Sequence, residues 1–138
     1  MERRTEKKRT FADVITSEEY TLLLTGEVQR AIAAARDRDP IEVAKDRRVP
    51  HARLVATQVK YLARAAQKLP SYAAAQCILP PLAFEQASSE ACAAHKRIGG
   101  DTVLDLTCGL GADAFFLSRR FGRGVTLARN AVLARVAA

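Results

Sequence analysis

Four residues at alternating positions could do chemistry near the carboxyl end of the sequence: Asp105, Thr107, Gly109 and Gly111. A strand that ends on an acid and turns through glycines into a helix is typical of a nucleotide-cofactor loop, because open α/β sheets bind ligands at this point. Glycine lets the backbone bend sharply and lets a cofactor approach closely. The Asp105 carboxylate can accept a hydrogen bond from a hydroxyl or a cationic group.

The glycine spacing narrows the kind of loop. It is Gly-x-Gly preceded by Thr107, and not the full G-x-G-x-x-G, which disfavours a dinucleotide-binding Rossmann fingerprint. The sequence has no G-x-x-x-x-G-K-[ST], which excludes a P-loop that cradles phosphates. The alternative to a cofactor loop is a tight strand-to-helix turn that binds nothing.

The elements around this loop predict a β-α-β unit. We expect a strand at 102–106, a helix at 112–121, a turn at 122–124, a second strand at 125–127 and a further helix from Asn130. A parallel pair of strands joined by a helix places the loop at the carboxyl edge of the sheet. The unit is therefore expected to carry any cofactor chemistry of the chain.

Upstream of this unit the sequence predicts helices. The expected helices are 17–36 with Ser17 as its N-cap, a short helix that Asp39 caps and Pro40 opens, a long helix from Pro50 to about 69, and one that Ser88 or Ser89 caps and that ends at 95–97. Residues 1–12 have the composition of a frayed polar start, and 77–81 that of a loop. We therefore predict an α/β protein with a helical region at 1–98 and a β-α-β region at 99–138.

The residues 103–111, VLDLTCGLG, resemble the first motif of class I S-adenosylmethionine (SAM)-dependent methyltransferases. Thr107 in the first glycine position is similar to a bacterial subgroup whose members end in a THUMP-like RNA-binding domain. Residues 68–72 (KLPSY), 85–90 (EQASSE) and 94–96 (AHK) resemble the same subgroup. A comparable Ser/Thr-x-Glu helix precedes the SAM loop in trimethylguanosine synthases and related RNA methyltransferases. The resemblance covers roughly residues 45–138.

The resemblance implies roles for individual residues. The methionine side of SAM would be lined by Asp105, Thr107, Gly109 and Gly111. Ser88, Ser89 and Glu90 would lie near the cofactor as a lid or support, the alternative being a helix cap and nothing more. The second strand departs from the family, because Ala128 stands where an acid would hold the ribose. Asn130 is the residue that could substitute.

The resemblance also bears on activity. A class I sheet has about seven strands, and we expect only two here, so we interpret the chain as an N-terminal part of a Rossmann-like methyltransferase, truncated and inactive alone. RNA is the expected acceptor, and SAM binding is expected to be weak or absent. We assign no catalytic residue. The alternatives are a non-enzymatic helical module that binds RNA or protein and keeps a remnant loop, and a different truncated α/β nucleotide-binding enzyme.

Composition and charge fit a basic globular protein. The net charge of +7 is compatible with contact to nucleic-acid phosphates or with a generally basic surface. Three scattered cysteines have no zinc-ligand spacing, so we expect no metal site and a reducing compartment. We also expect no secretory signal, no membrane span and a cytoplasmic location. A short parallel sheet would leave a free strand edge, which predicts self-association.

The distribution of the basic residues leaves two interpretations open. The predicted long helix carries four cations away from its apolar stripe: Arg53, Lys60, Arg64 and Lys68. These side chains could face phosphates, or they could form an ordinary solvated helix face.

Overall fold

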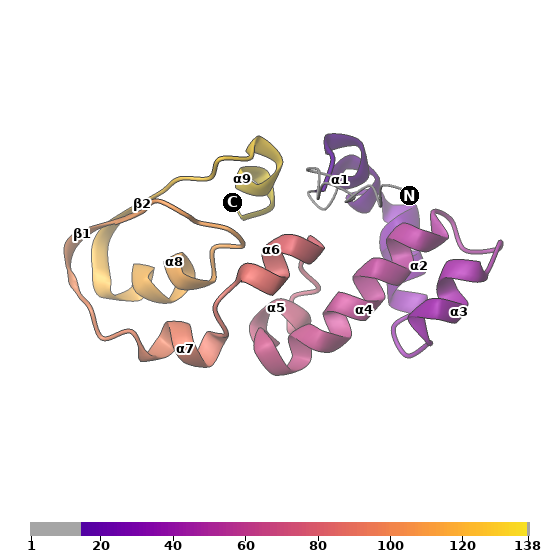
Figure 1. The fold of residues 1–138 in the computed structure, drawn as a ribbon, viewed down its shortest axis with the longest axis horizontal. Helices are drawn as coiled ribbons and strands as arrows, with labels where there is room; N and C mark the ends of the chain where they lie inside the picture. The colour runs from indigo at the N-terminus through magenta and orange to yellow at the C-terminus, as the bar shows by residue number, and fades with distance from the viewer. Residues whose placement is uncertain (1–14, 138) are drawn as a thin grey trace, which may run out of the picture.

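The computed structural model describes residues 15–137, which form a mixed α/β fold (Figure 1). Seven helices come first: α1 (Ser17–Leu23), α2 (Gly26–Ala34), α3 (Pro40–Lys45), α4 (Ala52–Lys68), α5 (Pro70–Ala74), α6 (Pro81–Gln86) and α7 (Glu90–His95). They are followed by β1 (Gly100–Asp105), α8 (Ala112–Leu117), a 3-10 turn η2 (Ser118–Arg120), β2 (Phe121–Thr126) and α9 (Ala131–Ala137). The expected order of a helical part and then a β-α-β unit is confirmed, while the polar start predicted at 1–12 lies outside the described residues.

Helix α4 is the longest element of residues 15–137 and organises the helical half (Figure 1). Its 17 residues carry apolar side chains at helical spacing, and Val55 and Ala65 are fully buried. The buried Gln58 uses its whole amide on the backbone of Leu79. Its Nε2 donates to the Leu79 carbonyl at 3.2 Å, and the Leu79 N–H donates to Oε1 at 3.0 Å. Because a buried amide is costly when unpaired, this exchange fixes the segment before α6 against α4.

The single helix predicted at 17–36 is wrong, because the chain breaks it into α1 and α2. Thr25 ends the first helix and caps the second, accepting a hydrogen bond from the Val28 N–H at 3.4 Å. Threonine side chains compete with the helical ladder in this way, and Gly26 is a poor helix former. The first cap is Thr16 and not Ser17: Thr16 and Glu19 form a capping box.

Two predicted caps are confirmed. Asp39 accepts a hydrogen bond from the Ile41 N–H at 2.7 Å, and Pro40 opens α3. Ser89 accepts one from the Cys92 N–H at 3.1 Å and caps α7. Each cap supplies an acceptor to an N–H group that the first helical turn leaves unpaired.

The two strands pair in parallel, but their bounds differ from the prediction. β1 begins at Gly100, and β2 begins at Phe121, so the turn predicted at 122–124 is wrong: Gly124 pairs with Val103 inside the sheet. Two closely spaced glycines indicate a turn, because the local sequence does not show whether a neighbouring strand pairs with them. The helix predicted at 112–121 is also shorter, because α8 ends at Leu117 and tightens into η2.

Apolar side chains of the sheet remain in contact with solvent. Leu104 is 57% exposed, Leu106 62% and Val125 41%, and Phe115 of the crossover helix is 45% exposed. Within the described residues, the apolar side chains of both strands are therefore only partly covered, as expected for an isolated pair of strands. Self-association through this surface stays a prediction.

One hydrophobic cluster nevertheless joins the helical half to the β-α-β unit. Leu110 and Ala112 belong to the same buried cluster as the residues of α4. Helix α9 returns to α1, where the Tyr20 hydroxyl donates to the Arg135 carbonyl at 3.1 Å (Figure 1). The boundary predicted near residue 98 thus has apolar contacts across it.

Two further observations limit the chemistry of residues 15–137. None of their helices combines the length and the apolar character that a bilayer span requires. Within the same range, no three His, Cys, Asp or Glu side chains lie where they could share a metal ion. Cys77, Cys92 and Cys108 are free thiols.

Candidate functional site

The loop between β1 and α8 starts where the two strands end together. The Leu127 N–H donates to the Asp105 carbonyl at 2.8 Å, and the Cys108 N–H donates to the Leu127 carbonyl at 3.0 Å. The Asp105 carboxylate accepts a hydrogen bond from the Thr107 N–H at 2.9 Å. These contacts turn the chain away from the sheet directly after the acid, so the loop leaves the carboxyl edge with a defined direction.

Both glycines of the loop have left-handed backbone conformations. Gly109 has φ +54° and Gly111 has φ +76°, and Gly111 is the N-cap of α8. A side chain disfavours this region, so the conformation itself requires glycine. The available space does not require glycine at position 111, because a Cβ there would lie 3.7 Å or more from its nearest neighbours. The sequence expectation that these glycines allow the bend is confirmed.

A tyrosine from the helical half holds the loop from behind. The Tyr72 hydroxyl donates to the Leu110 carbonyl at 2.9 Å, and Leu110 is only 3% exposed. Burial raises the pKa of Tyr72 to about 12, so the phenol stays a neutral donor at physiological pH. Helix α5 therefore fixes the middle of the loop.

A cleft of about 320 Å³ opens between the loop and α6. Leu82, Gln86 and Ser88 form one wall, and the loop from Thr107 to Asp113 forms the other. Small-molecule sites usually have volumes of roughly 300–1,000 Å³, so this cleft lies at the small end of that range. The cleft therefore places Gly109 of the loop opposite polar groups of the helical half, Gln86 and Ser88.

Asp113 joins the two walls of the cleft. The Ser88 hydroxyl donates to Asp113 Oδ2 at 3.0 Å. The other oxygen, Oδ1, is buried and receives no directed hydrogen bond within the described residues, although Lys96 Nζ lies 2.6 Å away. The Lys96 ammonium thus already neutralises this oxygen, and the ion pair links the end of α7 to α8.

The structure divides the predicted site residues into two groups. Ser88, Thr107 and Gly109 line the cleft. Asp105 and Gly111 lie instead on a second hollow, of about 340 Å³, against the sheet. The loop therefore separates two hollows and presents different residues to each.

The remaining predicted residues make structural contacts outside the cleft. Ser89 caps α7, and Glu90 accepts hydrogen bonds from the Ser71 N–H at 2.6 Å and the Ser71 hydroxyl at 2.9 Å. The side-chain oxygen of Asn130 caps α9, accepting from the N–H groups of Val132 and Leu133 at 2.8 and 3.1 Å. These oxygens already have donors, so Ser88 is the one of the three serine–glutamate residues that faces the loop.

The sequence analysis missed Asp113 and Tyr72. Asp113 lies in the first turn of α8, where an acid is ordinarily a partner of the helix dipole. Tyr72 lies 38 positions before its partner Leu110. Nothing in the local sequence indicates either contact, although Tyr72 ends the KLPSY segment on which part of the resemblance depended.

Comparison with known proteins gives one structural relative. No family model matches the sequence, and no curated protein sequence matches it either. The crystal structure of a putative methyltransferase from Porphyromonas gingivalis W83 superposes with a TM-score of 0.68 over 90% of this chain, at 26% sequence identity. The chain has a methyltransferase-like fold.

This methyltransferase-like fold includes both halves of the chain, because 90% coverage cannot be reached without the helices and the β-α-β unit. The chain spans 32% of the length of the Porphyromonas gingivalis protein. The helical half is therefore part of the shared fold, together with the loop that it supports.

The polar groups on the two sides of the loop suit SAM. Its amino-acid end carries an ammonium group and a carboxylate, which need acceptors and donors respectively. Asp113 Oδ1 is already paired with the Lys96 ammonium at 2.6 Å, whereas the loop backbone around Gly109 can be approached closely because no side chain covers it. Asp105 provides a second carboxylate at the end of β1. The residues present thus fit the cofactor that the resemblance implies.

Proposed function

We propose that this chain is the donor-binding part of a class I SAM-dependent methyltransferase that acts on RNA. The observation that carries the proposal is the cleft between Ser88 and the loop from Thr107 to Asp113, on a methyltransferase-like fold. The subgroup with a THUMP-like domain is part of the proposal, supported by the residues of the KLPSY and EQASSE segments.

Each residue of the cleft has a separate task in this proposal. Asp105, on the sheet side of the loop, would accept hydrogen bonds from the cofactor, and Gly109 would leave its backbone open to it. Ser88 and Lys96 would hold Asp113, and with it the start of α8, against the cleft, because they contact its two carboxylate oxygens at 3.0 and 2.6 Å. When bound, SAM supplies a methyl group on a sulfonium for transfer to a nucleophile. The chain's contribution is position and charge.

Affinity for SAM is proposed to be low in this chain. Ala128 follows β2 at the position where a carboxylate would hold the ribose hydroxyls, and alanine offers no acceptor. Asn130 does not replace it, because its side-chain oxygen is occupied by the amides of α9. The contacts that remain serve the amino-acid end of the cofactor.

Ultraviolet cross-linking of radiolabelled SAM tests the proposal and tolerates weak binding. We expect label on the wild-type chain that excess S-adenosylhomocysteine removes and ATP does not. The Gly109→Val variant should lose the label, because valine disfavours φ +54° and covers the backbone. Label that survives in Gly109→Val, or that ATP removes equally well, contradicts the proposed site.

A further inference from the structure

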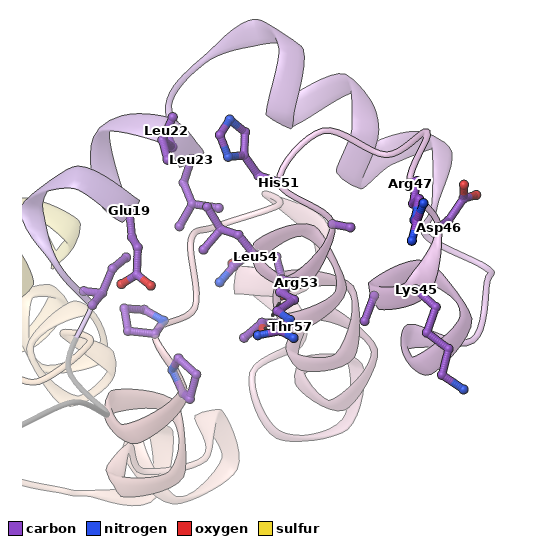
Figure 2. A pocket seen from close by; sticks show the side chains of 16 residues that line it. Glu19, Leu22, Leu23, Lys45, Asp46, Arg47, His51, Arg53, Leu54 and Thr57 are labelled. Carbon is purple, nitrogen blue, oxygen red and sulfur yellow. Dashed lines mark hydrogen bonds between the residues drawn. The ribbon is translucent and has the colours of Figure 1, made fainter.

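A further hollow, larger than the two beside the loop, lies in the helical half, between α1, the end of α3 and the first turns of α4. Its volume is about 690 Å³. Figure 2 shows Glu19, Leu22 and Leu23 of α1 on one side and Lys45, Asp46 and Arg47 on the other, with Arg53, Leu54 and Thr57 of α4 between them. We call this hollow the basic groove.

Cationic side chains of the basic groove are exposed and available. Lys45, Arg47, His51 and Arg53 all line it and all are exposed. Within residues 15–137, the ion pairs involve none of these four side chains. Lys45, Arg47 and Arg53 therefore present positive charge to solvent without an ion-pair partner among the described residues, and His51 adds an imidazole ring.

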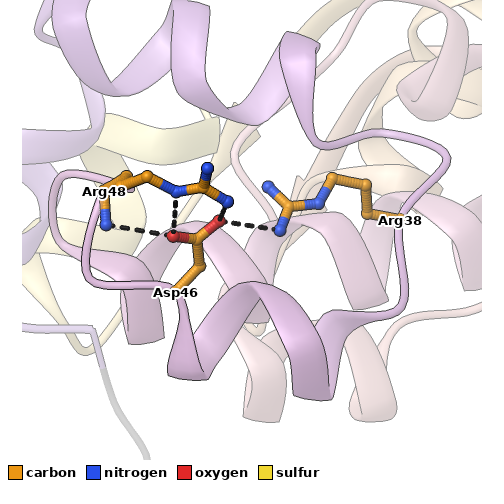
Figure 3. Close-up of polar contacts among 3 residues, drawn as sticks. All are labelled: Arg38, Asp46 and Arg48. Carbon is orange, nitrogen blue, oxygen red and sulfur yellow. Dashed lines mark hydrogen bonds and ion pairs between the residues drawn. The ribbon is translucent and has the colours of Figure 1, made fainter.

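The two acids that line the groove are already engaged. Glu19 accepts a hydrogen bond from the Thr16 N–H at 2.9 Å as part of its capping box. Asp46 is held between two arginines, accepting from Arg38 at 2.9 Å and from Arg48 at 3.0 and 3.1 Å (Figure 3). Arg38 and Arg48 neutralise Asp46, whereas Glu19 keeps its charge, so the described lining residues set Lys45, Arg47 and Arg53 against one carboxylate without an ion pair.

The Asp46 clamp also positions one of the cations. Asp46 accepts a further hydrogen bond from the Arg48 N–H at 3.0 Å, which closes a turn around Arg47. The two guanidinium groups hold the pKa of the Asp46 carboxyl far below its usual range, so the clamp stays charged at any physiological pH. Arg47 is thus presented from a turn that its neighbours fix.

Apolar side chains lie between the charges. Leu22, Leu54 and Pro81 contribute to the lining of the basic groove. Pro80 lines both the basic groove and the cleft beside the loop. Because Pro80 is fully buried, it is part of the wall that separates the two hollows.

We infer that the basic groove binds single-stranded RNA next to the cofactor cleft. The cations come from the end of α3, the following loop and the start of α4, so they follow an extended polyanion better than a single compact anion. Bases stack on histidine rings and arginine planes, and the leucine and proline surface can receive their apolar faces. The inference rests on the proposed function, because RNA is the methyl acceptor proposed there.

Binding of a fluorescein-labelled oligouridine, followed by anisotropy over a series of salt concentrations, tests the inference. The test variant is Arg47→Ala with Arg53→Ala. The matched control is Arg30→Ala with Arg36→Ala, which removes the same charge from exposed positions of α2 and the residues after it, outside the groove. All four arginines are exposed, so each variant is expected to fold.

We expect the groove variant to lose roughly tenfold or more in affinity, and its salt dependence to be less steep by about 1.4 in the log–log slope, for two lost phosphate contacts. The control should change by less than about twofold. Equal losses in both variants, no loss in the groove variant, equal competition by inorganic phosphate, or groove-dependent binding to phosphatidylserine vesicles in place of RNA would each overturn the inference.

SAM cross-linking on the same proteins separates the two proposals. The groove variant should keep its cofactor label, and Gly109→Val should keep RNA binding while it loses that label. RNA binding that fails while SAM labelling persists refutes the groove alone. The reverse result refutes the proposed function and leaves a helical RNA-binding module.

Discussion

The hydroxyl of Tyr72 donates a hydrogen bond to the carbonyl oxygen of Leu110, 2.9 Å away, and so links α5 to the loop after β1. The two residues lie 38 positions apart, in the two halves of the chain. The helical half thus shapes the candidate cofactor site directly, as it also does through Ser88 and Asp113. Leu110 also belongs to the hydrophobic cluster that the two halves share, so this hydrogen bond and the apolar contacts hold the same loop residue.

Replacing Tyr72 with Phe should destabilise the chain and change its response to alkali. Loss of one hydrogen bond is expected to cost about 0.5–1.5 kcal/mol in the free energy of unfolding. The raised pKa of Tyr72, about 12, means that the folded state keeps a proton that the unfolded state releases near pH 10. The contribution of Tyr72 to the free energy of unfolding is therefore complete below about pH 10 and is lost as the pH rises toward 12.

Urea unfolding at neutral pH and at about pH 11 measures both effects. The stability gap between wild type and Tyr72→Phe should narrow at the higher pH. Tyr61→Phe is the matched control, since the Tyr61 hydroxyl contacts Glu85 at 3.5 Å and not the loop. A gap that stays constant with pH would show that Tyr72 does not hold the loop through its neutral phenol.

Two adjacent serines should have separable effects. Ser89→Ala is expected to lower stability by about 1 kcal/mol, because it removes the cap of α7, and to leave SAM cross-linking of the folded chain unchanged. Ser88→Ala should reduce cross-linking, because Asp113 loses the donor to Oδ2. Thermal melts and cross-linking of both variants check this, and a reversed pattern would remove Ser88 from the site.

Introducing the absent carboxylate should strengthen cofactor binding. Ala128→Glu would add a charged acceptor for a ribose hydroxyl. One such hydrogen bond contributes about 1.5–3 kcal/mol to the binding free energy, which corresponds to roughly 10- to 150-fold in affinity. Calorimetric titration with SAM measures the gain, and Ala128→Gln tests whether the charge matters. An unchanged affinity in Ala128→Glu would indicate that the ribose does not lie at the end of β2.

Residues 1–138 alone are expected to transfer no methyl group. Among the described residues, the sheet has two strands with exposed apolar side chains, and no group is assigned to orient an acceptor beside the sulfonium. Incubation with radiolabelled SAM and total bacterial RNA checks this. Label in the RNA above a heat-killed control would refute the expectation.

Local patterns predicted much of the fold. The caps formed by Asp39 and Ser89 and the strand that ends at Asp105 follow from residue types within a few positions of one another. The two glycines of the loop were also identified, since a strand-to-helix turn with φ above zero needs them. These features depend on short-range steric and hydrogen-bonding preferences.

Features that depend on tertiary contacts could not be predicted in this way. The glycine at 124 lies in a strand because Val103 pairs with it, and a turn was predicted from its composition. The hydrogen bond between Ser88 and Asp113 spans 25 positions, so a cap at Ser88 and a contact at Ser88 look alike in sequence. The division of the helix predicted at 17–36 depends on the Thr25 hydroxyl, which donates to the Leu22 carbonyl and accepts from the Val28 N–H.

An NMR titration of the isotopically labelled chain with SAM tests the central claim most directly. At up to about 10 mM cofactor we expect the amides of residues 107–113 and Ser88 to shift along one saturable curve, with a Kd in the millimolar range, and Gly109→Val to abolish these shifts. Amides of Ser89 and Glu90 should shift less, because their side chains are committed to α7 and Ser71. No shift in the loop, or the same shifts in Gly109→Val, would contradict the assignment of this cleft to SAM.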